Sequence, residues 1–116
     1  MDNTHVMFIG WNRPLLGREK NGLEVYDGFV NYLDKLVTDK QIGSFEPVWL
    51  TPHGGDLNSF VLIRGHLDDL NRLVMTDDWR KWISQLTYIF DGFGITHGHI
   101  GEEINTHLTH YRRLLS

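Results

Sequence analysis

The order of apolar patterns along the chain restricts its fold more than any other feature. A strand-like run at Val6–Trp11 precedes an amphipathic helix pattern that begins near Glu19. Two further strand-like segments, Ile42–Thr51 and Phe60–Gly65, follow and are joined by a Gly-rich turn. Strands show alternation or a short apolar run, whereas helices repeat apolar residues every three or four positions. The first half of the chain therefore predicts the order strand, helix, strand, strand.

The second half adds a helix, a strand and a final helix. A Leu-rich helix pattern starts after Gly65 and is interrupted at Thr76. Threonine is a good N-cap residue, so we expect the helix to break there and to restart. A last strand at Phe93–Gly101 precedes a C-terminal helix that opens with Glu102 and Glu103. Acidic residues at this position favour the positive end of the helix dipole.

This series predicts one α+β domain over residues 1–116, a length typical of a single domain. The expected architecture is a ferredoxin-like βαββαβ antiparallel sheet of strand order 4-1-3-2, with an added C-terminal helix. Both main helices pack on one face and the other face stays open. The second strand is then an edge, which agrees with Pro47, because proline cannot donate a hydrogen bond within a sheet.

Composition excludes several classes of function. The chain is 41% hydrophobic and 22% charged, which is ordinary for a globular domain. A net charge of −4 offers no basic stripe for phosphates, so we expect no nucleic-acid partner. The absence of cysteine excludes disulfides and thiolate chemistry. No apolar run approaches the roughly 18 residues of a membrane span and the N-terminus has no signal-peptide pattern, so we expect a cytoplasmic protein without membrane association.

The chain also resembles the dimeric α+β barrel superfamily, whose members pair two such sheets, open face to open face. The resemblance covers about Thr4–Gly101. It rests on the element order, on the hairpin Pro52–Asn58 and on the Leu-rich helix followed by Thr76-Asp77-Asp78-Trp79. It implies the fold and a homodimer. The superfamily includes cofactor-free oxygenases, haem-degrading enzymes and isomerases, so the resemblance implies no single reaction.

Glu46 and Arg64 form the first candidate site. A hairpin centred near Gly55 pairs these two residues on one face of the sheet. We assign that face to the open side, because Val61 and Ile63 on the other face suit contact with the helices. The pair is either a partly exposed structural ion pair or a charged pair in an enclosed cavity, where Arg64 holds an anionic or carbonyl oxygen. A register slip of one residue would move both side chains to the other face.

The histidines form the second candidate site. His97 and His99 are two residues apart on the last strand and so point to one face. They are partly exposed surface residues, or residues of a ligand pocket that include a general base, or metal ligands that need a third partner. Glu46, on the opposite edge strand, is a poor third ligand within one subunit. Glu103, His107 and His110 share the polar side of the final helix. This side is either exposed to solvent or a surface that binds a metal ion.

The best functional prediction is a small-molecule enzyme or binding protein that uses a cavity at the dimeric sheet interface. We expect neither a metal nor an organic cofactor, and a small organic or anionic ligand. In this prediction His97 and His99 are catalytic and transfer protons. Glu46, Arg64 and Trp11 bind the ligand, with Trp11 as a pocket wall at the end of a central strand. The alternative is a non-catalytic structural or regulatory interaction protein.

Overall fold

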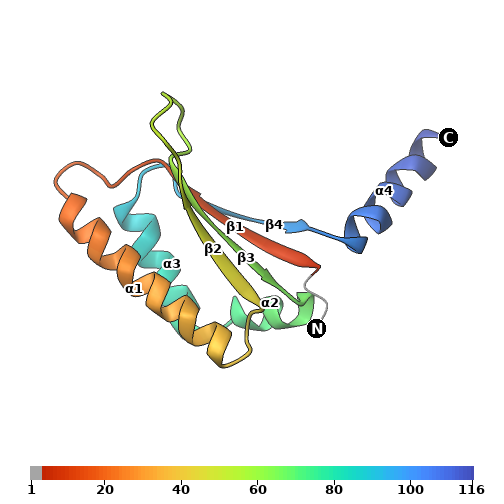
Figure 1. The fold of residues 1–116 in the computed structure, drawn as a ribbon, viewed down its shortest axis with the longest axis horizontal. Helices are drawn as coiled ribbons and strands as arrows, with labels where there is room; N and C mark the ends of the chain where they lie inside the picture. The colour runs from red at the N-terminus through yellow and green to blue at the C-terminus, as the bar shows by residue number, and fades with distance from the viewer. Residues whose placement is uncertain (1–3) are drawn as a thin grey trace.

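A computed structural model describes residues 4–116 (Figure 1). Its elements are β1 (His5–Trp11), α1 (Glu19–Thr38), β2 (Ser44–Trp49), β3 (Ser59–Gly65), α2 (Leu67–Leu73), α3 (Asp77–Ile89), β4 (Gly94–His99) and α4 (Glu102–Leu115). The four strands form one antiparallel sheet of order β2-β3-β1-β4, which is the predicted order read from the other edge. None of the helices between residues 4 and 116 has the length and hydropathy of a transmembrane segment.

Helices α1 and α3 cover one face of the sheet, which we call the covered face (Figure 1). Alternate residues of a strand point to opposite faces. Met7 and Ile9 of β1 and Val61 and Ile63 of β3 all point to this face and are fully buried. The helices complete the core with large apolar side chains, namely Phe29, Leu33, Leu36, Trp79, Leu86 and Ile89. The hydrophobic core thus lies entirely on this side of the sheet.

The apolar pattern predicts the period of α1 correctly and its inward face in part. The predicted inward side chains are Leu23, Tyr26, Val30, Leu33 and Val37. The structure fully buries Leu33 from this set and packs Tyr26 and Val37 against the core, and it also buries Gly22, Phe29 and Leu36. Leu23 is 53% exposed, because the helix turns Phe29 toward α3. There the Phe29 ring lies 6.2 Å from the ring of Trp79 and 6.1 Å from that of Trp82.

Two local features let α1 and α3 pack closely. The predicted break at Thr76 is confirmed, since its side-chain oxygen accepts a hydrogen bond of 3.3 Å from the backbone N–H of Trp79. This cap starts α3 in a new direction after α2. In α1, a Cβ atom at Gly28 would lie 2.7 Å from the Trp82 ring. Glycine at this position therefore allows the indole to approach the helix backbone.

Helix α4 departs from the rest of the fold. Gly101 precedes it with a φ of 62° and a ψ of −137°, a conformation that is essentially restricted to glycine. From this turn α4 extends away from the sheet (Figure 1). None of its residues is buried. Its larger apolar side chains are exposed, and they are Ile104, Leu108, Tyr111, Leu114 and Leu115.

Candidate functional site

The second face of the sheet, here called the open face, has no covering layer in the chain. The strand register places twelve side chains or glycines on it: Val6, Phe8, Gly10, Ser44, Glu46, Val48, Phe60, Leu62, Arg64, Gly94, Thr96 and Gly98. Phe8 and Phe60 stack at its centre with ring centroids 5.0 Å apart. Phe8, Phe60 and Leu62 remain only partly buried. The open face therefore presents apolar surface that a single chain leaves in water.

A hollow of about 260 Å³ lies at one end of the open face. Gly10 and Gly94, which are direct cross-strand partners, line it together with Phe8, Leu57 and Thr96. A Cβ atom at Gly10 would lie 2.8 Å from both the Leu57 and the Phe8 side chains. The hollow thus depends on glycine at position 10, which has no side chain to fill it. The signal in the sequence is Gly10 itself, since a glycine inside an apolar strand indicates close approach of another group.

Arg64 and Glu46 form an ion pair on the open face, with 3.4 Å between Arg64 Nη2 and Glu46 Oε1. Their side chains are 35% and 58% exposed. The predicted register was wrong by two residues, because Ser44 lies opposite Arg64 and Glu46 lies opposite Leu62. The hairpin is centred on Gly54, whose φ is 82°, and not on its neighbour. A slip of two residues preserves the face, so the pair forms diagonally.

The ion pair and the hollow lie toward opposite ends of the open face. Arg64 is directly opposite Val6, four residues along β1 from Gly10. At a rise of about 3.3 Å per residue, this separates the two backbone positions by roughly 13 Å. Phe8 and its cross-strand partner Leu62 lie between these two positions. A ligand in the hollow that also reaches Arg64 must extend over this apolar surface.

The structure does not bring the other predicted site residues to the open face. Trp11 is 2% exposed and packs in the core, with its ring 4.9 Å from that of Phe90, so it is not a wall of an open-face pocket. His97 lies opposite Met7 and His99 lies opposite His5. Because Met7 belongs to the covered face, the two histidines point away from the side that carries Arg64. Glu46, Arg64 and the histidines therefore do not form one site within a chain.

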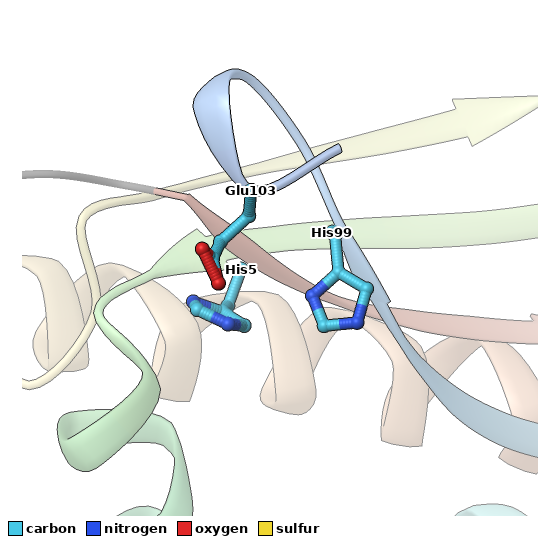
Figure 2. A group of neighbouring side chains, drawn as sticks. All are labelled: His5, His99 and Glu103. Atoms are coloured by element: carbon cyan, nitrogen blue, oxygen red, sulfur yellow. The ribbon is translucent and has the colours of Figure 1, made fainter. Parts of the chain in front are cut away.

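His99 instead belongs to a cluster where the start of β1 lies beside the end of the edge strand β4. One ligand atom each from His5, His99 and Glu103 lies within 4.8 Å of the others, and Figure 2 shows the three side chains converging. The ring centroids of His5 and His99 are 5.2 Å apart, and the His107 ring lies 4.9 Å from that of His99. The sequence pattern places His99 and Glu103 in two separate candidate groups and does not indicate His5. The predicted strand order contained the missing signal, since antiparallel pairing sets the start of the first strand beside the end of the last.

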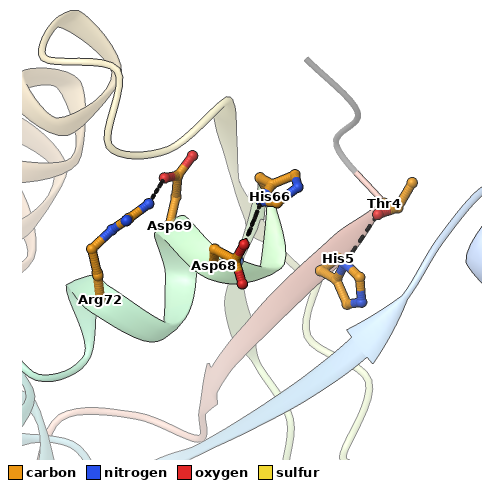
Figure 3. A network of polar contacts seen from close by, with 6 residues as sticks. All are labelled: Thr4, His5, His66, Asp68, Asp69 and Arg72. Carbon is orange, nitrogen blue, oxygen red and sulfur yellow. Dashed lines mark hydrogen bonds and ion pairs between the residues drawn. The ribbon is translucent and has the colours of Figure 1, made fainter.

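Polar contacts around α2 have a structural role (Figure 3). His66 caps this helix, because its Nδ1 accepts a hydrogen bond of 3.3 Å from the backbone N–H of Asp68. Arg72 donates to the carboxylate of Asp69 one turn away. Nearby, the Thr4 hydroxyl lies 3.0 Å from Nδ1 of His5. The last contact fixes an imidazole of the cluster shown in Figure 2.

Tyr32, between α1 and α3, has a perturbed hydroxyl group. Burial raises its pKa above the ordinary value of 10.0, because the phenolate loses hydration in this position. A side-chain hydrogen bond with Thr76 lowers the pKa and the charge of Asp78 raises it further. The group lies on the helical layer, so it belongs to neither the open face nor the histidine cluster.

The sequence matches no family model, and a search of the curated proteins finds no match. Among solved structures, the chain is similar to a dimeric protein of unknown function and ferredoxin-like fold from Bacteroides fragilis NCTC 9343. The identity is 14%, with 83% of this chain and 96% of that chain covered, and the TM-score is 0.61. It is also similar to SnoaB, a cofactor-independent oxygenase from Streptomyces nogalater, at 15% identity, with 84% of this chain and 92% of that chain covered and a TM-score of 0.50. These likenesses show the ferredoxin-like fold that the sequence predicts.

Proposed function

We propose that the chain forms a homodimer in which the open faces of two sheets pack together and enclose a binding site for a small organic molecule. The ligand has an apolar body and an anionic or carbonyl oxygen. The observation that carries this proposal is the hollow floored by Gly10 and Gly94 on an otherwise apolar open face. A second copy of the chain would close this hollow from solvent.

The case for the homodimer rests on the unpartnered apolar surface. Phe8, Phe60 and Leu62 are only partly buried although they lie at the centre of a sheet. Contiguous apolar surface of this kind favours association, at about 25 cal/mol for each Å² removed from water. The structure from Bacteroides fragilis with the same fold is described as dimeric, and 96% of that chain is covered. Both facts favour a second copy as the partner of the open face.

The ligand chemistry follows from what lines the open face. The hollow is lined mainly by apolar groups, so it suits a hydrocarbon or aromatic part. Among the described residues of this face, the titratable side chains are Glu46 and Arg64. A guanidinium offers paired donors that match a carboxylate or a carbonyl oxygen. We therefore propose a binding function in which Arg64 holds the polar end of the ligand.

Native mass spectrometry of tag-free protein tests the assembly and reports any bound molecule. The binding site is tested with 8-anilinonaphthalene-1-sulfonate, a fluorescent probe with an aromatic body and an anionic group. We expect a dimer whose probe affinity falls about tenfold in Arg64→Met, because a hydrogen bond to a charged group contributes about 1.5–3 kcal/mol. Arg72→Met, on exposed α2, is the matched control and should bind the probe as the wild type does.

Three outcomes contradict the proposal in different ways. A monomer would remove the enclosed site altogether. Equal probe affinity in Arg64→Met and Arg72→Met would remove the role of Arg64. A ligand-free dimer that binds no probe would favour the alternative, a structural or regulatory interaction protein.

A further inference from the structure

We propose that His5, His99 and Glu103 bind a divalent first-row transition-metal ion such as Zn²⁺, and that the ion fixes α4 against the β1–β4 edge. This inference goes beyond the proposed function and does not depend on it. The three side chains come from β1, β4 and the first turn of α4 (Figure 2). None of them belongs to the open face. Within residues 4–116, this is the group of three histidine and carboxylate side chains close enough to share an ion.

The two imidazoles are held together by the sheet. His5 and His99 are direct cross-strand partners in the antiparallel β1–β4 pair. Their ring centroids lie 5.2 Å apart with an edge-to-face orientation. The backbone N–H of Ile100 donates a hydrogen bond of 2.8 Å to the carbonyl oxygen of Thr4. This bond continues the pairing beyond the strands and keeps the two histidines in register.

Glu103 reaches the histidines because of the turn before α4. Gly101, with its positive φ of 62°, turns the chain between β4 and α4. The carboxylate of Glu103 then points back toward the end of β4 (Figure 2). Glu103 is partly buried, whereas the other residues of α4 are exposed. The first turn of α4 therefore contacts the sheet edge at the cluster, and the rest of the helix extends into solvent.

The donor set and its spacing suit a transition metal. Two imidazoles and one carboxylate are typical ligands of Zn²⁺, whereas Mg²⁺ and Ca²⁺ prefer oxygen ligands. Ligand atoms around a tetrahedral zinc ion lie about 3.4 Å apart, given metal–ligand distances of about 2.0–2.1 Å. The three atoms here lie within 4.8 Å of one another. Small side-chain rotations bring them to bonding distance.

Two neighbouring groups support the site. The Thr4 hydroxyl lies 3.0 Å from Nδ1 of His5, which orients the ring and leaves Nε2 for a metal. A hydrogen bond to the second ring nitrogen is a common feature of metal-binding histidines. His107 lies one turn beyond Glu103, with its ring 4.9 Å from that of His99. Its imidazole thus lies beside His99 and outside the set of three ligand atoms.

Isothermal titration of metal-free, tag-free protein with Zn²⁺ tests the site. We expect one ion per chain and an affinity that falls about tenfold or more in His99→Gln and in Glu103→Gln. His97→Gln is the matched control, because His97 is also an exposed β4 histidine but lies outside the cluster. It should bind Zn²⁺ as the wild type does. Far-ultraviolet circular dichroism of each variant verifies that the fold is intact.

A second measurement tests the effect on α4. Trypsin can cleave α4 at Arg112 and Arg113, which are exposed near its end. We expect Zn²⁺ to slow this cleavage in the wild type and not in His99→Gln. The absence of saturable Zn²⁺ binding in the wild type, or equal weakening in His97→Gln and His99→Gln, would overturn the site. Saturable binding with unchanged cleavage would overturn the fixing of α4.

Discussion

The two faces of the sheet differ in what the chain provides for them. On the covered face, Met7, Ile9, Val61 and Ile63 are fully buried under α1 and α3. On the open face, Phe8, Phe60 and Leu62 of the same strands remain partly exposed. The same two strands thus contribute buried side chains to the core on one side and solvent-exposed apolar surface on the other. The difference indicates that folding of the chain and assembly of the chain are separable properties.

This separation predicts which substitutions affect stability and which affect association. A change on the covered face removes contacts that exist within the chain, so it lowers the free energy of unfolding. A change on the open face removes contacts that we propose to form between two copies. The following predictions take the expected effects in order, from the largest to the smallest.

Leu33→Ala should destabilise the fold most. Leu33 of α1 is fully buried in the core. Removing a buried leucine side chain costs about 2–5 kcal/mol of unfolding free energy, which urea denaturation at fixed protein concentration measures. Leu23→Ala on the same helix is the matched control, because Leu23 is 53% exposed, and it should change this value by about 0.5 kcal/mol or less. Similar losses in both variants would contradict the observed orientation of α1.

Leu62→Glu should dissociate the dimer with a smaller effect on the folded chain. Leu62 lies at the centre of the open face, opposite Phe8. An unpaired carboxylate buried between two copies costs about 3 kcal/mol or more, so the dissociation constant should rise by about 100-fold or more. Analytical ultracentrifugation measures this change. Leu16→Glu, at a loop residue that is 94% exposed, is the control and should remain dimeric.

Two glycine substitutions should separate stability from binding. Gly28→Ala places a methyl group 2.7 Å from the Trp82 ring in the helical layer. Overpacking costs about 1–3 kcal/mol, against a gain of about 1 kcal/mol in helix propensity, so we expect a net loss of stability. Gly10→Ala places a methyl group 2.8 Å from the ends of the Leu57 and Phe8 side chains on the open face. There the side chains have room to move.

We therefore expect Gly10→Ala to weaken binding of the anilinonaphthalene probe more than it lowers stability. Leu16→Ala, at a loop residue that is 94% exposed and lies outside the open face, is its control. Probe titration and urea denaturation of the same samples give both values. A larger loss of stability in Gly10→Ala than in Gly28→Ala would contradict the contrast between the two faces.

Tyr32→Phe should have the smallest effect, confined to alkaline pH. Burial raises the pKa of Tyr32 in the folded chain above 10.0, so the native state keeps this proton more tightly than the unfolded state does. The resulting contribution to stability is complete below pH 10.0 and is lost as the pH rises through the folded-state pKa. Urea denaturation at increasing pH should show a shallower loss in Tyr32→Phe than in the wild type. Identical profiles would contradict the raised pKa.

Much of the fold could be predicted from the sequence, because it depends on element order. The pattern of strands and helices, Pro47 on an edge strand and the cap at Thr76 are local signals, and the structure confirms the arrangement they predict. Two predicted details, the centre of the hairpin and the inward face of α1, differ from the structure for physical reasons. The hairpin is centred on Gly54 and not on the predicted Gly55, because the sequence of a long loop does not define its midpoint. The face of α1 depended on the packing of Phe29 against α3, which the periodicity of one helix does not contain.

The sites were less predictable because they join residues that are distant in sequence. Arg64 and Glu46 were assigned to the open face correctly, since strand alternation survives a two-residue slip. His99 was grouped with His97 by proximity in sequence, whereas the structure groups it with His5 and Glu103. That grouping depends on the end of β4 and on the turn at Gly101. Such arrangements follow from tertiary structure and leave a weak signal in the sequence.

Cross-linking through a single introduced cysteine tests the central claim most directly, because the natural chain contains none. Packed sheets lie about 10 Å apart, so Leu62→Cys on paired open faces should react with a short bis-maleimide to give a covalent dimer. Leu16→Cys should remain a single chain under the same conditions. A covalent dimer in Leu62→Cys alone is the predicted result. Equal cross-linking of both variants, or none in Leu62→Cys, would contradict the proposal that two open faces pack together.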